Sequence, residues 1–433
     1  MKRLLAWITV NMLLASLWIL RRVDHYFLGS SALRPDDDFR RDPYTSFNIL
    51  RGNGPVLRSF ANRGWIVLGY KEVRDALTHG AFSSDFTRSR FVVQLANAAS
   101  GDKPFPLIEN PPLLNQDPPN HTRLRKLASQ GFVNRYIQSL EPTIERQVNE
   151  LLDAVGDRTT FDVVRELAEP LPAFVIAEMM GVPEADRYRF LAWSHALTGA
   201  TMLTRPDLMA KAADAESEMR DYLGNLVATK QRNPGEDFIS KLVLAESEQD
   251  SLSRSEVIST CILLLTAGHE TTTRLIGNGL FTLMQHPDQF DQLLQDRSLL
   301  DNAIEEILRY EPPVQETVRF IAEDTVFHGH RMKRGQMVLV NFAAANRDPA
   351  ANPRPDQFTI DRTAPVHVSF GHGIHLCLGL ALAHLEARVV FNALLDRYQQ
   401  FKCVEEDPPW QLNPFFRGLD HLHVKVYPRS GGP

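Results

Sequence analysis

The pattern of apolar and polar positions predicts helices through the middle of this 433-residue chain. Apolar stripes at helical spacing predict helices over residues 159–180, 186–197 and 208–231. Nearer the start, residues 56–70 predict a β-hairpin that turns at Asn62-Arg63-Gly64, and residues 71–79 predict a short helix. Residues 85–118 mix apolar side chains with proline and glycine. We therefore expect a long loop there, and long loops in compact enzymes usually carry function.

The longest predicted helix begins at the capping box Ser253-Arg254-Ser255-Glu256 and ends before His286-Pro287. It would hold about 33 residues and span about 50 Å. A helix this long and this apolar must run through the core of the protein.

The middle of this helix carries the stretch Ala267-Gly268-His269-Glu270-Thr271-Thr272. Glycine close to threonines is poor helix material, and buried threonine hydroxyls can bond back to carbonyl groups and open the hydrogen-bond ladder. We therefore expect a local bulge with a small cavity. The alternative is a polar patch in a buried helix whose hydroxyls satisfy their own backbone.

Residues 4–20 form an apolar run with basic residues on both sides. As a helix the run would span about 26 Å, against a hydrocarbon core of about 30 Å, which is the short limit for a transmembrane segment. The first interpretation is a single N-terminal membrane anchor, and the second is a signal peptide, although no cleavage-site pattern follows closely. The third is a helix lying on a surface, or an upstream start codon.

Composition and charge exclude some classes of function. The chain is 43% apolar and 23% charged, as is usual for a globular protein, and its net charge of −6 does not indicate nucleic-acid binding. Its three cysteines, Cys261, Cys377 and Cys403, are too few and odd in number for a disulfide framework and fit a reducing compartment.

The stretch Phe370-Gly371-His372-Gly373-Ile374-His375-Leu376-Cys377-Leu378-Gly379 concentrates glycines and histidines around one thiol. Gly371 and Gly373 permit a tight turn with positive φ, and the apolar helix predicted after Gly379 places Cys377 at a helix N-terminus, where the dipole lowers a thiol pKa. No second cysteine lies nearby, so a zinc site or an iron–sulfur cluster is not supported. A lone thiolate suits the axial position of a haem iron.

The spacing F-G-x-G-x-H-x-C-x-G resembles the haem-binding loop of the cytochrome P-450 monooxygenases of bacterial type, and every fixed position is filled. The resemblance covers roughly residues 40–427. It implies a mainly α fold with small β-sheets, in which a haem b lies between the long central helix and the Cys-loop helix. For the domains we expect an anchor or leader over residues 1–22, a linker over 23–39 and one catalytic domain over 40–433.

The resemblance also assigns roles to individual residues. Cys377 is implied as the metal ligand, and Glu270 and Thr271 as the acid–alcohol pair that delivers protons during oxygen activation. The implied cofactor-binding residues are Cys377, His121, Arg125, Arg319, His375 and Phe370. Glu306 and Arg309 match a buried structural pair that contacts the segment before the haem loop. Alone, each short motif is weak, since an i, i+3 or i, i+4 pair is common on helix surfaces.

The implied activity is insertion of one oxygen atom of dioxygen into an apolar small molecule by hydroxylation or epoxidation. Electrons would come from NAD(P)H through a separate ferredoxin- or flavodoxin-type partner with its reductase, and we expect Arg123, Arg125 and Lys126 to face that partner. The implied location is cytoplasmic, with or without anchoring by residues 4–20. Two alternatives stay open: a peroxide-driven peroxygenase, against which Glu270-Thr271 argues, and a haem sensor or carrier without turnover.

Overall fold

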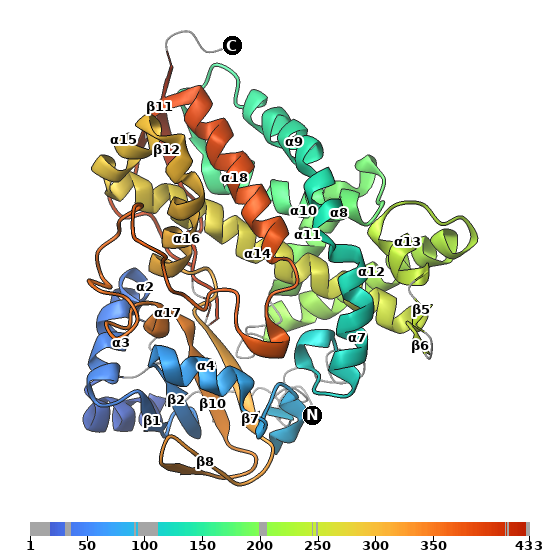
Figure 1. Cartoon of the computed structure of the whole chain (residues 1–433). Helices are drawn as coiled ribbons and strands as arrows, with labels where there is room; N and C mark the ends of the chain where they lie inside the picture. Colours follow the sequence, from blue (N-terminus) through green and yellow to red (C-terminus); the bar gives the residue numbers. More distant parts are fainter. Residues whose placement is uncertain are drawn as a thin grey trace.

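The computed structural model describes residues 18–30, 36–90, 92–93, 111–198, 206–244, 246–247, 250–411, 413 and 415–429. Helices dominate, and the sheets are small (Figure 1). The helices are α2 (Asp37–Arg41), α3 (Pro43–Gly52), α4 (Tyr70–Thr78), α7 (Asn120–Ala128), α8 (Asn134–Ser139), α9 (Glu141–Asp153), α10 (Pro170–Met179), α11 (Arg187–Thr198), α12 (Pro206–Arg232), α13 (Phe238–Leu244), α14 (Arg254–Gln285), α15 (Pro287–Gln295), α16 (Leu300–Tyr310), α17 (Phe342–Asn346) and α18 (Leu380–Arg397).

The strands form one sheet of five strands, in the order β1-β2-β10-β7-β3, and one of three, in the order β11-β12-β4. Two further antiparallel pairs are β5-β6 and β8-β9. The strands are β1 (Val56–Ser59), β2 (Gly64–Val67), β3 (Phe82–Ser83), β4 (Thr160–Asp162), β5 (Glu246–Ser247), β6 (Asp250–Ser251), β7 (Glu316–Ile321), β8 (Thr325–Phe327), β9 (His330–Met332), β10 (Met337–Asn341), β11 (Tyr398–Cys403) and β12 (His423–Pro428).

The core lies around α14, which packs against α10, α11, α12, α16 and α18. Its capping box is present, with Ser253 and Glu256 bonded to each other's backbone, and its last residue is Gln285 as predicted. In Figure 1 the helices surround α14, and the five-stranded sheet lies to one side, with α4 beside it. The fold therefore places α7, α14, β7 and α18, which are far apart in the sequence, around a common interior.

The hairpin prediction is confirmed, because β1 and β2 pair antiparallel and Arg63 takes a positive φ of 49° in the turn. The single helix predicted over 159–180 is wrong. Its first residues form β4, which pairs with β12, and a π-helical turn, Val164–Ala168, precedes α10. Pro170 and Pro172 have no N–H to donate, so they sit in the first turn of α10.

The bulge predicted in α14 is also absent. The helix is α-helical at every residue from Arg254 to Gln285. The hydroxyls do bond back to carbonyls, Thr266 to Ile262 at 2.9 Å and Thr271 to Ala267 at 2.7 Å, but the ladder stays closed.

The predicted anchor lies outside the described residues except for 18–20. No described helix is both long and apolar enough to cross a membrane. Residues 18–28 are helical, and Asp24, within the segment expected as a linker, is 1% exposed. Its carboxylate accepts hydrogen bonds from the Ser59 hydroxyl at 2.7 Å and the Phe60 N–H at 2.8 Å. This part of the chain is therefore tied to the first hairpin.

Candidate active site

The loop that carries Cys377 is a tight, hydrogen-bonded turn. Gly371 and Gly373 have φ of 74° and 72°, and the Cys377 N–H donates to the Phe370 carbonyl at 2.9 Å. A Cβ on Gly373 would lie 2.8 Å from Cγ2 of Thr78 in α4, so the loop also packs too closely there for a side chain. The glycines thus act as the sequence predicted, and Cys377 precedes α18 by three residues.

The Cys377 thiol differs from the sequence prediction in its pKa. Burial raises the pKa, while a hydrogen bond from the Gly379 N–H and the charge of Arg125 lower it, and the net direction is upward. In the protein alone, burial therefore outweighs the lowering of the pKa that is predicted from the helix N-terminus. Binding of a cation at the sulfur would supply the missing stabilisation of the thiolate, because metal ligands of this type must be deprotonated.

A group of cationic and imidazole side chains, some buried and some half-buried, lies near this loop. The rings of His121, from α7, and His375, from the Cys377 loop, have centroids 4.2 Å apart, and Ser84 Oγ lies 3.0 Å from His375 Nε2. Burial, and then Arg319 and His121, lower the His375 pKa to about 3. His121 is 2% exposed, and neither of its ring nitrogens has a hydrogen-bond partner among the described residues.

The arginines of this group also lack an anion. Arg319, in β7, is 5% exposed and donates to the Thr317 hydroxyl and the Val318 carbonyl, and burial lowers its pKa to about 10. Burial likewise lowers the pKa of Arg125. Asp117 raises the Arg319 pKa slightly, but its carboxylate is held by Ser83, Ser84 and Arg88. Within the described part of the chain, no carboxylate forms an ion pair with Arg319 or Arg125.

We call His121, Arg125, Arg319 and His375 the anion cradle. The sequence predicted all four, and the structure brings His121, His375 and Arg319 together while Arg125 lies close enough to act on Cys377. Phe370 lies at the base of the loop and its ring packs 5.0 Å from the ring of His384 in α18. A ligand with a metal at its centre and carboxylates at one edge would satisfy both the thiol and the cradle.

The middle of α14 presents a second set of polar groups. The carboxylate of Glu270 accepts from the Thr198 hydroxyl at 2.7 Å and pairs with Arg274. Burial raises the Glu270 pKa, but the charge of Arg274 and the hydrogen bonds from Arg274 and Thr198 outweigh it, and the net direction is downward. Glu270 is therefore held as a carboxylate, and it is buried beside Thr271, whose side chain is half-buried.

The accessible side of α14 marks where a ligand can approach. Ala267 is exposed and Leu264, Gly268 and Thr271 are half-buried, although most of the surrounding helix is buried. The spacing of three and four residues places these positions on one stripe of the helix. Thr271 is on this stripe, so its side chain lies on the accessible side of α14 and not on its buried face.

Sequence reasoning missed the partners of this stretch. Arg274 is four residues after Glu270, a spacing that could have suggested the pair, and its other nitrogen donates to Gln411 at 2.6 Å. His269 is fully buried, with Nδ1 2.7 Å from Ser194 Oγ and Nε2 2.9 Å from the Glu169 carbonyl. Burial lowers the His269 pKa to about 4, so His269 is neutral and structural.

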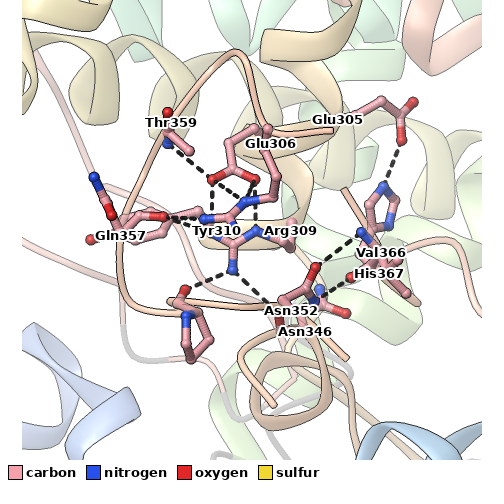
Figure 2. Close-up of polar contacts among 12 residues, drawn as sticks. Glu305, Glu306, Arg309, Tyr310, Asn346, Asn352, Gln357, Thr359, Val366 and His367 are labelled. Carbon is pink, nitrogen blue, oxygen red and sulfur yellow. Dashed lines mark hydrogen bonds and ion pairs between the residues drawn. The ribbon is translucent and has the colours of Figure 1, made fainter. Parts of the chain in front are cut away.

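The Glu306–Arg309 pair of α16 is fully buried and holds the segment before the Cys377 loop (Figure 2). Arg309 donates to the carbonyls of Asn346, Pro355 and Gln357, and Glu306 accepts from the Thr359 N–H. Figure 2 also shows Asn346 and Asn352 within the same network, where Asn352 donates to the Val366 carbonyl. The network fixes the path of residues 346–369 and hence the position of the loop that follows.

Comparison with known proteins gives a consistent result. The cytochrome P450 family model matches residues 66–419. Cytochrome P450 monooxygenase PikC of Streptomyces venezuelae is 40% identical over 398 residues, which cover 90% of this chain and 92% of the relative. Cytochrome P450 107B1 of Saccharopolyspora erythraea is 39% identical over 397 residues, covering 90% and 96%.

Solved structures agree with the fold. P450BioI, crystallised with an acyl carrier protein carrying hexadec-9Z-enoic acid, superposes with a TM-score of 0.81 at 35% identity. The superposition covers 90% of this chain and 99% of that one.

Proposed function

The chain belongs to the cytochrome P450 family and is a monooxygenase of that family, and from this premise we propose that Cys377 binds the iron of a haem b. The family implies the haem. The choice of haem b, the roles of individual residues, the substrate class and the electron donor are our proposals. The observation that carries them is the pairing of one half-buried thiol, Cys377, with an anion cradle whose arginines have no carboxylate partner among the residues that the structure describes.

The residues fit a haem. Cys377 would hold the iron through its sulfur, and its loop is held in place by hydrogen bonds and by contact with α4. The propionates would be bound by His121, Arg125, Arg319 and His375, with one ring N–H of His121, which has no partner among the described residues, and the guanidinium of Arg319 as donors. The macrocycle would lie between α14 and α18, against the accessible stripe around Ala267 and Thr271.

The haem supplies the binding and reductive activation of dioxygen, which a thiolate ligand favours. Thr271 then positions a proton donor on the accessible side of α14, with its hydroxyl able to leave the Ala267 carbonyl. Glu270 is an ionised, buried carboxylate whose two oxygens accept from Thr198 and Arg274 and keep further lone pairs, so it can accept a proton and relay it toward Thr271. The substrate is an apolar small molecule held on the same side, next to Leu264 and Ala267.

The electron donor we propose is a separate ferredoxin- or flavodoxin-type protein with its reductase. The structure changes which residues could meet it. Arg123 pairs with Glu256 in the capping box of α14, and Arg125 is turned toward Cys377, so of the three predicted cations Lys126 alone is exposed. Omitting the ferredoxin from an NADPH consumption assay should abolish turnover. Full turnover with hydrogen peroxide alone would support a peroxygenase instead.

Replacing Cys377 with serine tests the ligand assignment. Cys377→Ser should abolish the thiolate-type absorption band of the reduced carbon monoxide complex and with it the oxygenation of any substrate, because a serine hydroxyl does not ionise under these conditions. The control is Cys403→Ser, in β11, which should leave the band unchanged. A Cys377→Ser protein that keeps the band would show that another residue binds the iron.

Replacing Thr271 with alanine tests the proton donor. Thr271→Ala should keep NADPH consumption but lower product yield and raise hydrogen peroxide, since loss of a positioned proton donor commonly costs about a hundredfold in the productive step. Thr266→Ala is the matched control, because Thr266 makes the same bond to its own backbone in the same helix. Product and peroxide are measured per NADPH. Equal uncoupling in the two variants would mean that the effect comes from α14 in general.

A further inference from the structure

A second group of ligand-type side chains lies outside the active site, at the edge of the sheet β11-β12-β4. Glu405 follows the end of β11 by two residues, His423 is the first residue of β12, and His421 precedes it by two. The two strands are antiparallel neighbours, and the Val404 N–H donates to the His423 carbonyl at 2.9 Å (Figure 1). The strand pairing therefore brings a carboxylate and a His-x-His pair together.

The ligand atoms converge on one point. Glu405 Oε1 lies 2.8 Å from His423 Nδ1 and 3.7 Å from His421 Nε2, and all three atoms lie within 4.8 Å of one another. A tetrahedral zinc ion with bonds of about 2.0–2.2 Å separates its ligand atoms by about 3.3 Å. The two Glu405 separations lie on either side of this value, so small side-chain rotations would bring Glu405 and each imidazole to bonding distance of one ion.

Two further observations point to a ligand. Glu405 Oε2 is buried and has no hydrogen-bond partner among the residues that the structure describes. Behind His421, the Oδ2 atom of Asp420 lies 3.6 Å from Nδ1, the ring nitrogen that does not face Glu405. At 3.6 Å the pair is not hydrogen-bonded, but a carboxylate that closes this distance when the ring binds a metal would orient the imidazole and raise its basicity. Asp420 is itself fixed by Arg165 at 3.1 Å.

We propose that Glu405, His421 and His423 bind a zinc-class divalent ion, independently of the haem. Three protein ligands leave the fourth position to water. Imidazole and carboxylate ligands together favour Zn²⁺ over Mg²⁺ or Ca²⁺, which prefer oxygen ligands alone. The ion would join the end of β11 to the start of β12, where Glu405 and His423 otherwise share one hydrogen bond.

The experiment is equilibrium dialysis of the haem-loaded, tag-free enzyme against Zn²⁺, with the bound metal measured by mass spectrometry. We expect one equivalent of zinc in the wild type, none in the double variant His421→Ala/His423→Ala, and an unchanged zinc content in the presence of excess Mg²⁺. Asp420→Asn should weaken zinc binding about tenfold without removing it. The reduced carbon monoxide spectrum of each variant checks that the fold and haem site are intact.

The matched control is His328→Ala. His328 also contacts two carboxylates, Asp75 at 2.9 Å and Glu72 at 3.7 Å, but through opposite ring nitrogens, so the three groups do not converge. It should bind zinc as the wild type does. X-ray absorption at the zinc edge should show nitrogen and oxygen neighbours without sulfur. Absence of zinc from the wild type, full retention by the double variant, or a sulfur neighbour would each overturn the proposal.

Discussion

Two groups of arginine side chains in this molecule differ in whether the described residues supply their anions. In the first, Arg309 and Arg362 share the carboxylate of Glu306, whose side chain is fully buried together with that of Arg309. In the second, the anion cradle, Arg319 is only 5% exposed, but no carboxylate among the described residues forms an ion pair with it. Both groups carry the desolvation cost of a buried guanidinium, but only the first recovers it internally.

The difference separates scaffold from binding site. Every donor that Arg309 directs at its neighbours reaches an oxygen of Glu306 or a main-chain carbonyl, so the first group is complete as folded. Among the described residues, both ring nitrogens of His121 in the cradle lack partners; burial lowers the pKa of Arg319, and burial together with the charges of Arg319 and His121 lowers the pKa of His375. A dianionic ligand would oppose both pKa shifts. Missing internal partners are thus stronger evidence for a ligand than the presence of charges.

The largest loss of stability should come from breaking the group formed by Glu306, Arg309 and Arg362. Glu306→Gln keeps the shape of the side chain but leaves two guanidiniums without an anion, which should lower the free energy of unfolding by about 3–5 kcal/mol. Urea unfolding followed by circular dichroism measures it. Glu150→Gln is the matched control, since the exposed Glu150 also lies between two arginines, Arg146 at 2.8 Å and Arg187 at 3.9 Å. It should lose less than about 1 kcal/mol. Similar losses in both variants would contradict the distinction.

The second-largest effect should come from the anion cradle, and it should appear in haem binding and not in the stability of the haem-free protein. Arg319→Met removes a cation with no internal anion, so the haem-free protein should keep its stability, while haem dissociation should become about tenfold to a hundredfold faster through loss of a charge-assisted hydrogen bond. The rate is measured by transfer of haem to an excess of apomyoglobin. An unchanged rate with a destabilised apoprotein would make Arg319 a scaffold residue like Arg309.

How far the sequence predicts these groups depends on how local each one is. The Cys377 turn and the capping box of α14 are contiguous patterns, so the residues alone indicate their geometry, and the structure has both. The cradle assembles residues 121, 319 and 375 from a helix, a strand and a loop, and only the family resemblance connected them. The Glu405–His421–His423 group depends on the pairing of β11 with β12, which no local pattern specifies.

The errors have a similar origin. The segment 159–180 has helical periodicity throughout, but tertiary pairing with β12 converts its start into a strand. The bulge predicted at Gly268 does not form, and α10 packs closely against α14 at this point, with Ile176 so near that a Cβ on Gly268 would lie 2.7 Å from its side chain. For Cys377, the predicted effect of the helix end was real in direction but smaller than burial, whose size the sequence does not reveal.

The smallest effect concerns Glu305, a carboxylate whose histidine partners can change their charge with pH. Glu305, in α16, lies between His367 Nε2 at 2.7 Å and His384 Nε2 at 2.5 Å. Burial raises the Glu305 pKa, but the two histidines outweigh it and bring it to about 2, and the same contact raises the pKa of His384 against the opposing effect of burial. Because the His384 ring packs against Phe370, this cluster adjoins the Cys377 loop.

The signs of these shifts set a pH window. The lowered pKa of Glu305 contributes stability that is present above its ordinary value of 4.5 and is lost as pH falls toward 2. The raised pKa of His384 contributes stability that is present below its ordinary value of 6.5 and is lost as pH rises through the folded-state value. The contribution of the cluster is therefore largest between these two ordinary values.

Glu305→Gln should accordingly destabilise the protein most near pH 5.5 and least near pH 8.5. The Glu305 side chain is 36% exposed, so solvent screening limits the difference to at most about 1 kcal/mol. Urea unfolding of wild type and variant at both pH values measures it. Glu150→Gln should show a small effect that is the same at both, because its arginine partners stay charged throughout. A loss in Glu305→Gln that is equal at the two pH values would mean that packing, and not the charge of His384, holds Glu305 in place.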